Sequence, residues 1–226
     1  MIVVSDSREE PSELRLTRRL EDPDASARLR AALAAGMRPA AEQVDVLVRR
    51  CAVEPEFAVR DMLTWALTRH DRQVAVARLL VELQAREPQA RSQALHTLSK
   101  IGDRRAWPAI TTALLEDADD EVARTAWRTA VRLVPEASAA DLADRLVTQL
   151  GRGDRDTQLS LSRAIVALGE AATDALRRAS THRDEAVRAH ADVTARLVRD
   201  PELAFDAAVA LAIRVRALRG APLVDS

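Results

Sequence analysis

Apolar residues recur at steps of three and four between Pro88 and Pro135, which is the period of one face of an α-helix. Gly102 interrupts the first apolar run, and Pro108 stands just inside the second, where a first helical turn does not need its missing N–H group. An acidic cluster at 117–121 then precedes a third run and can cap the start of a helix. The pattern predicts helices separated by short stops and packed as antiparallel pairs.

The same pattern returns along the chain at steps of about thirty to thirty-five residues, which is typical of helix-pair repeats. The reference positions of the successive copies are Arg28, Arg60, Arg91, Ala123, Gln158 and Arg188. They predict about six helix pairs in one domain at 12–219, between flexible ends at 1–11 and 220–226. The expected helices are 13–20, 25–35, 40–51, 56–69, 72–86, 89–101, 105–116, 120–133, 139–150, 156–168, 171–180, 184–199 and a capping helix at 202–218.

The central copy resembles the HEAT-like repeat of the phycobilisome-lyase type. The residues that carry this resemblance are Ala90-Arg91, Ala94, Leu98, Ile101-Gly102-Asp103 and Ala106-Trp107-Pro108-Ala109-Ile110. The resemblance implies an all-α fold, a right-handed α-α superhelix of the HEAT or armadillo-like type. It also implies that the repeated arginines Arg28, Arg60, Arg91 and Arg188 form an internal ladder with acidic residues of neighbouring pairs, and we leave them out of the predicted site.

Composition agrees with this fold and narrows the function. Of 226 residues, 47% are hydrophobic but only 2% are aromatic, a composition that suits closely packed helices better than strands. The formal charge of -1 provides no overall attraction to nucleic acid or an anionic membrane. A single cysteine, Cys51, excludes a disulfide framework and a four-thiolate zinc site. The start of the chain lacks the pattern of a signal peptide, and no apolar run reaches membrane-spanning length, so we expect a cytoplasmic protein.

Motifs for catalysis are missing from the sequence. It contains no Gly-x-Ser-x-Gly elbow, no glycine loop for phosphate and no His-Glu-x-x-His helix. The four histidines, His70, His96, His182 and His190, lie in different repeats without a second ligand at metal spacing. We therefore predict a non-enzymatic protein with no metal and no cofactor.

A basic stripe on the second helices is the candidate binding surface, because residues one, five and nine positions after each reference residue share a helix face. The predicted partner-binding residues are Asp61, Trp65, Arg69, His96, Lys100, Arg124, Arg128, Arg132 and Arg163. Like charges at four-residue spacing cost a few tenths of a kcal/mol per pair, which an acidic partner would relieve. The alternative is that these arginines only keep an alanine-rich chain soluble. Trp107 and Trp127 are expected in the core.

The leading hypothesis is a scaffold that binds an acidic or mixed-charge protein segment along the inner face of the superhelix. A second hypothesis is DNA binding, because some HEAT-like solenoids are alkylpurine DNA glycosylases, and here only Asp61, Trp65 and Arg128 could play the corresponding parts. A third is a bilin lyase, although the absence of Tyr leaves little to stack on a tetrapyrrole. The apolar run from Leu203 to Ile213 fits either a terminal cap or contact with a second copy, and the oligomeric state stays open.

Overall fold

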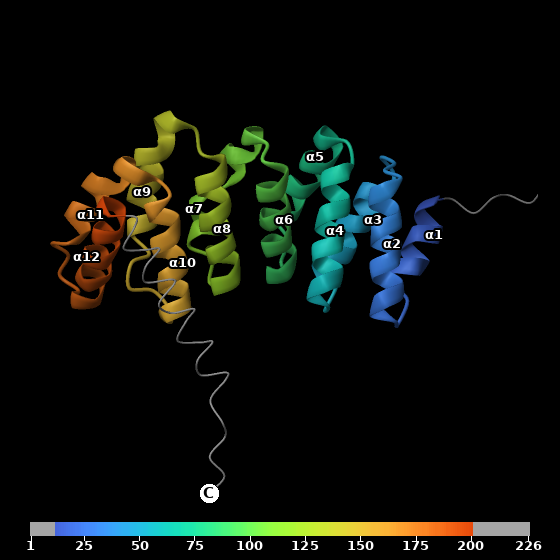
Figure 1. The fold of residues 1–226 in the computed structure, drawn as a ribbon, viewed down its shortest axis with the longest axis horizontal. Coiled ribbons are helices and arrows are strands. Elements are labelled where there is room, and N and C mark those ends of the chain that lie inside the picture. Colours follow the sequence, from blue (N-terminus) through green and yellow to red (C-terminus); the bar gives the residue numbers. More distant parts are fainter. Residues whose placement is uncertain (1–11, 201–226) are drawn as a thin grey trace, which may run out of the picture. The chain divides into compact units, whose positions relative to one another are not determined.

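The fold is that of a computed structural model, in which residues 12–200 are described (Figure 1). Contacts divide the chain into two compact units, 1–135 and 136–226, and each is described by itself. Throughout 12–200 every regular element is a helix, with no strand, as predicted. The predicted flexible ends and the capping helix at 202–218 lie outside the described residues. A single domain at 12–219 stays a prediction.

The first unit consists of helix pairs arranged in two layers. Its elements are α1 (Ser12–Leu20), α2 (Ala25–Met37), α3 (Gln43–Val53), α4 (Phe57–Arg69), α5 (Arg72–Glu82), α6 (Pro88–Ile101), the 3-10 helix η1 (Arg104–Ala109), α7 (Thr112–Leu115) and α8 (Asp120–Leu133). Helices α2, α4, α6 and α8 contact one another in succession, and α1, α3 and α5 do the same in the other layer (Figure 1). This is the packing of a helix-pair repeat.

The second unit continues the same helix-pair pattern. Its described elements are η2 (Glu136–Ser138), α9 (Ala139–Val147), α10 (Arg155–Val166), η3 (Gly169–Ala172), α11 (Thr173–Ala179) and α12 (Glu185–Arg199). Helix α10 contacts both α9 and α12, and α11 also packs on α12.

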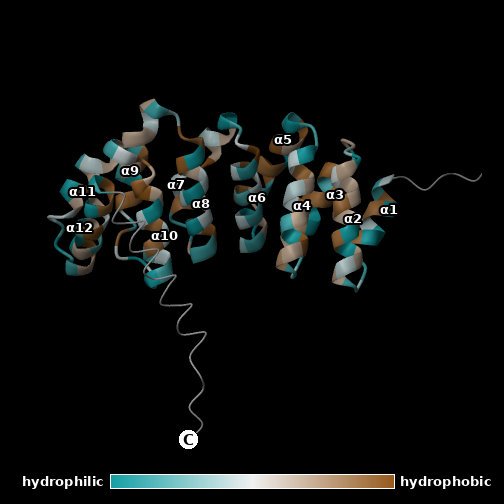
Figure 2. Cartoon of the chain, in the orientation of Figure 1, coloured by the Kyte–Doolittle hydropathy of each residue, from teal (hydrophilic) through white to brown (hydrophobic). Residues whose placement is uncertain are grey.

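Small and branched apolar side chains fill the space between the two layers. Leu47, Leu63, Leu95 and Trp127 are fully buried there. Figure 2 shows the hydrophobic residues gathered between the layers and the hydrophilic ones on the outward faces of the helices. Each helix buries one face against its neighbours, and this burial explains why the three- and four-residue period of apolar residues predicts the helices.

The prediction of one continuous helix at 105–116 is wrong, because the structure has two short helices there. The structure has the 3-10 helix η1 up to Ala109 and then the four-residue α7, with Thr111 extended between them (ψ 164°). Pro108 lies inside η1 and not in the first turn of an α-helix. Because proline has no N–H group and its ring crowds the preceding turn, the α-helical hydrogen-bond pattern cannot run through this position.

Carboxylates cap several helices, as the acidic clusters in the sequence indicated. Asp24, Asp119 and Asp184 each accept hydrogen bonds from two backbone N–H groups at the start of the following helix, at 2.8–3.4 Å. Each cap satisfies donors that have no partner inside the helix, and its charge is favourable at the positive end of the helix dipole.

The repeated arginines, here called the turn arginines (Arg28, Arg60, Arg91 and Arg188), bind the turn that precedes their own helix. In each case Nη1 donates to the carbonyl oxygens five and six residues earlier, at 2.6–3.0 Å. Two also meet a carboxylate of the next pair: Arg28 meets Glu54 at 2.8 Å, and Arg91 meets Asp117 at 2.9 Å. The expected ladder of ion pairs is therefore partial, whereas the bonds to backbone are shared by all four.

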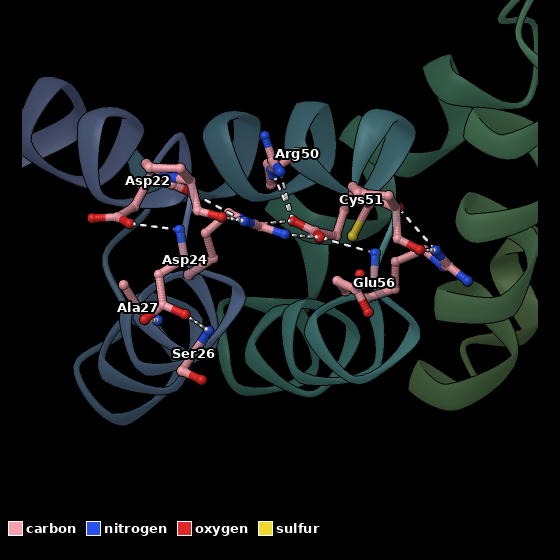
Figure 3. A network of polar contacts seen from close by, with 12 residues as sticks. Asp22, Asp24, Ser26, Ala27, Arg50, Cys51 and Glu56 are labelled. Carbon is pink, nitrogen blue, oxygen red and sulfur yellow. Dashed lines mark hydrogen bonds and ion pairs between the residues drawn. The ribbon is translucent and has the colours of Figure 1, made fainter.

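Glu54 is the most buried acid in this network, and its side chain has no exposed surface. Figure 3 shows the polar contacts of the network, which include those of Asp22, Arg50 and Glu56. Burial alone would favour the neutral acid, but Glu54 accepts hydrogen bonds from Arg28, from the backbone N–H of Glu56 and from Arg50. These bonds outweigh the burial and lower the pKa of Glu54 to about 2. The turn between α3 and α4 is thus built around an ionised carboxylate.

Gly36 lies at a close contact between α2 and α4. A Cβ atom at this position would lie 2.3 Å from Trp65 Cζ3 and 2.9 Å from the Ala66 Cα. Replacing a helical glycine with alanine normally raises the free energy of unfolding by about 0.5–1 kcal/mol, but overpacking of this kind lowers it by about 1–3 kcal/mol. We therefore expect Gly36→Ala to lower the free energy of unfolding by about 1–2 kcal/mol in urea denaturation. The loss should be smaller in a Trp65→Ala background, because the nearer of the two clashes is then gone.

Candidate functional site

A groove of about 550 Å³ lies across α4, α6 and α8 of the first unit. Polar and charged side chains dominate its lining. The residues that line it are Phe57, Arg60, Asp61, Ser92, Gln93, His96, Ser99, Lys100, Glu121, Thr125, Arg128, Thr129 and Arg132. A cleft of this size suits a short stretch of polypeptide or a small polar ligand.

Cross-helix hydrogen bonds fix the register of the three helices. The hydroxyls of Thr64 on α4 and Thr97 on α6 lie 3.3 Å apart, 33 residues apart in sequence. Ser92 on α6 and Thr125 on α8 repeat this spacing of 33 residues at 3.4 Å. The three helices therefore run parallel, and residues separated by 33 positions lie at the same height along the groove.

Positive charge is concentrated where α6 and α8 end. Lys100 is the second-last residue of α6, and Arg132 is the second-last residue of α8. Arg132 Nε donates to the carbonyl oxygen of Ser99 at 2.7 Å, which holds the two cations on neighbouring helices side by side. Neither forms an ion pair with any residue of the described range 12–200. The arrangement leaves two positive charges available to a ligand.

Negative charge in the groove is smaller and partly compensated. Glu121, in the first turn of α8, lies 3.4 Å from Arg128 and 3.9 Å from Arg124. Arg128 also donates to the hydroxyl of Thr125 at 2.9 Å. Asp61, in the first half of α4, is the other acid of the lining. The basic residues Arg60, Lys100, Arg128 and Arg132 thus outnumber the two acids.

His96 stands half-buried in the lining, between these charges. Burial lowers the pKa of His96 below its ordinary value of 6.5, and the positive charges of Lys100 and Arg128 lower it further, against smaller opposing effects of Asp61 and Glu121. His96 is therefore neutral at neutral pH, with a ring that can donate one hydrogen bond and accept another.

The structure brings together five of the nine predicted partner-binding residues in this groove: Asp61, His96, Lys100, Arg128 and Arg132. The other four lie elsewhere. Trp65 packs over Gly36 and is 38% exposed, and Arg69 is exposed near the end of α4. Arg124 pairs with Glu121 beside the groove, and Arg163 is exposed on α10 of the second unit.

Sequence reasoning missed Phe57, Arg60 and Glu121 as lining residues. The resemblance places Arg60 in the internal ladder, and its Nη1 atom does bind backbone carbonyls, yet the side chain also lines the groove. The sequence pattern indicates only a helix-capping role for Glu121, as part of the acidic cluster at 117–121. Phe57 is the first residue of α4 and lies one four-residue step before Asp61. Extending the stripe by one step toward the start of the helix would therefore have included it.

The two predicted core tryptophans differ in burial. Trp127 is fully buried, and its Nε1–H donates to the carbonyl oxygen of Leu115 at 2.8 Å. Trp107 is only half-buried.

A serine and a histidine in the second unit have the spacing of a nucleophile and a base. Ser162 Oγ and His190 Nε2 lie 2.8 Å apart. However, the backbone N–H of Gly151 donates to His190 Nδ1 at 3.0 Å, so the proton of the neutral ring is on Nε2, which cannot accept the serine proton. Both side chains are buried, and burial lowers the pKa of His190. This pair is a structural clamp on the turn at Gly151.

Residues 12–200 contain no metal-binding cluster, no reactive thiolate and no membrane-spanning helix. No group of three or more His, Cys, Asp or Glu side chains within 12–200 is placed to hold a metal ion. Burial raises the pKa of the Cys51 thiol to about 12, so this cysteine does not provide a thiolate. Among the described helices, none combines the length and apolar character needed to cross a membrane.

Comparisons with known proteins concern the fold. Two engineered proteins solved by the Northeast Structural Genomics Consortium resemble the chain: one at 20% identity over 84% of this chain and 97% of that one (TM-score 0.46), the other at 16% over 84% and 99% (TM-score 0.45). The complex of CpcE and CpcF of phycocyanin lyase from Nostoc sp. PCC7120 matches at 18% identity over 83% of this chain and 77% of that one (TM-score 0.47). Similarity at this level carries no argument about function.

No curated protein sequence matches the chain. The family model described as HEAT repeats matches residues 52–131, which include α4, α6 and all of α8 except its last two residues. This match identifies residues 52–131 as HEAT repeats, and the described helix pairs outside that range show the same kind of pairing.

Proposed function

We propose that the chain is a non-enzymatic binding protein that holds an acidic or mixed-charge protein segment in the groove of α4, α6 and α8. The observation that carries this proposal is the excess of positive charge in the lining, with Lys100 and Arg132 side by side at one end. Arginine and lysine beside one another repel, and carboxylates of a partner would relieve that repulsion while accepting charge-assisted hydrogen bonds.

A protein ligand fits this groove better than DNA does. The DNA glycosylase-like hypothesis requires three residues at the site. Asp61 and Arg128 line the groove, but Trp65 packs over Gly36 instead. The acids Asp61 and Glu121 would also face the phosphates of a nucleic acid, whereas a mixed-charge protein segment can accommodate them.

The test is capture of partners from lysate of the source cells by the wild-type chain and by the double variant Lys100→Glu with Arg132→Glu. We expect the variant to bind the captured protein at least tenfold more weakly, because two attractive contacts become repulsive. Affinity of the purified partner, measured by calorimetry, gives the ratio.

The matched control is Arg69→Glu with Arg104→Glu, which makes the same change in net charge at two exposed residues outside the groove. Equal loss in both variants would mean that only overall charge matters, which contradicts the proposal. Captured material that a nuclease removes would favour the nucleic-acid hypothesis instead.

A further inference from the structure

An exposed aromatic ring lies at the end of the groove opposite the paired cations. Phe57 is 74% exposed, although it lines the groove as the first residue of α4. Single exposed apolar residues are common on protein surfaces. This one differs from the others because it adjoins a charged cleft.

The ring of Phe57 lies beside an arginine that is itself anchored. The Arg60 guanidinium carbon lies 5.9 Å from the centre of the ring, a cation–π distance. Arg60 is itself anchored, since its Nη1 donates to the carbonyl oxygens of Glu54 at 2.8 Å and Pro55 at 2.6 Å. A side chain that is ordered before binding loses less conformational entropy when a ligand packs on it.

The helix register gives the separation between this ring and the cations. Because residues 33 positions apart lie at the same height, Phe57 is level with Ala90 on α6. Lys100 lies ten residues beyond Ala90, a rise of about 15 Å along the helix. Phe57, Lys100 and Arg132 also stand on successive helices, whose axes lie about 8–10 Å apart, so an extended chain needs about five to seven residues to reach from the ring to the cations.

Polar groups line the path between the two ends. Gln93 and Ser99 of α6 are half-buried in the lining, and the neutral ring of His96 stands between them. Amide, hydroxyl and imidazole groups can bond the N–H and C=O groups of an extended main chain without regard to its side chains.

We propose that the groove selects an extended segment in which an apolar side chain, packed on Phe57, stands about five to seven residues from a pair of carboxylates bound by Lys100 and Arg132. This inference rests on the proposed function and adds to it the spacing of the recognised features. Charge alone then supplies attraction, and the apolar contact supplies selectivity among acidic segments.

The test is selection of random dodecapeptides, displayed on phage, against the full chain. We expect enriched peptides to carry adjacent acids with an aromatic or aliphatic residue about five to seven positions away. For the best synthetic peptide, Phe57→Ser should weaken binding about tenfold, as measured by fluorescence anisotropy. Replacing the apolar residue of the peptide with serine should weaken binding to the wild type equally and bring no further loss with Phe57→Ser.

Met37→Ser is the matched control, since Met37 is 70% exposed and does not line the groove. Thermal unfolding of both variants should match that of the wild type, because neither removes buried surface. Acidic peptides enriched without the apolar residue, or unchanged binding in Phe57→Ser, would overturn this inference and leave the proposed function intact. Selected peptides that bind Lys100→Glu with Arg132→Glu as tightly as the wild type would overturn both.

Discussion

Replacing Glu54 with glutamine is expected to lower the free energy of unfolding by about 3–5 kcal/mol. The change keeps the shape of the side chain but leaves the buried guanidinium of Arg28, whose side chain is 7% exposed, without its counter-charge. Arg50 loses the same partner, at 2.7 Å. Urea denaturation followed by circular dichroism measures the loss.

The pH dependence of this loss identifies its cause. The pKa of Glu54 is about 2 in the folded chain, against an ordinary value of 4.5, so its ionised form stabilises the fold fully above about pH 4.5. That contribution disappears as the pH falls toward 2. The difference between wild type and Glu54→Gln should therefore shrink across this window. A difference that stayed constant would mean that packing, and not charge, explains the loss.

An exposed ion pair provides the control for Glu54. Asp174 and Arg177 lie 3.2 Å apart, but their side chains are 77% and 73% exposed. Because solvent screens such pairs, Asp174→Asn should change the free energy of unfolding by less than about 0.5 kcal/mol. An effect as large as that of Glu54→Gln would contradict the role assigned to burial.

Trp127→Ala is expected to be as damaging as Glu54→Gln, at about 3–5 kcal/mol of unfolding free energy. Trp127 is fully buried on α8, and its indole N–H donates to the carbonyl oxygen of Leu115, the last residue of the short α7. Alanine would leave a large cavity and an acceptor without its donor. Thermal denaturation should show a clearly lower midpoint.

Phenylalanine at position 127 separates the two contributions. It keeps much of the ring and loses only the hydrogen bond and part of the volume, so we expect about 1–2 kcal/mol. The exposed Phe57 is the comparison residue, and Phe57→Ala should cost less than about 1 kcal/mol. A Trp127→Ala protein as stable as the wild type would mean that α7 does not depend on this contact.

Much of the fold was predictable from the sequence, because each helix buries one face and the chain repeats the same pair. The apolar period, the capping acids and the Gly102 stop gave the helices nearly correct bounds. The failure at 105–116 has a local cause, since a proline tolerated in a first turn also permits a 3-10 helix. Sequence pattern alone does not separate the two, because Pro108 is compatible with either kind of first turn and the break follows directly after it.

The candidate site was only partly predictable. Steps of four along one helix correctly grouped His96 with Lys100 and Arg128 with Arg132, since those pairs lie on single helix faces. The groove also depends on how neighbouring helices are offset, which hydrogen bonds between buried hydroxyls determine. Phe57 joins the lining one four-residue step before Asp61, while the contact with Gly36 directs Trp65 elsewhere.

The turn arginines have a consequence for how such an array could gain or lose repeats in evolution. The carboxylate that pairs with a turn arginine stands six residues before the reference position of the next repeat. Arg28 pairs with Glu54 in this way, but the corresponding residue for Arg60 is Ala85, which has no charge. Deleting the second pair would therefore set the buried Arg28 opposite Ala85, without a counter-charge. Deleting the third would set Arg60 opposite Asp117 and create an ion pair. The repeats look alike in outline, yet they are not equally dispensable.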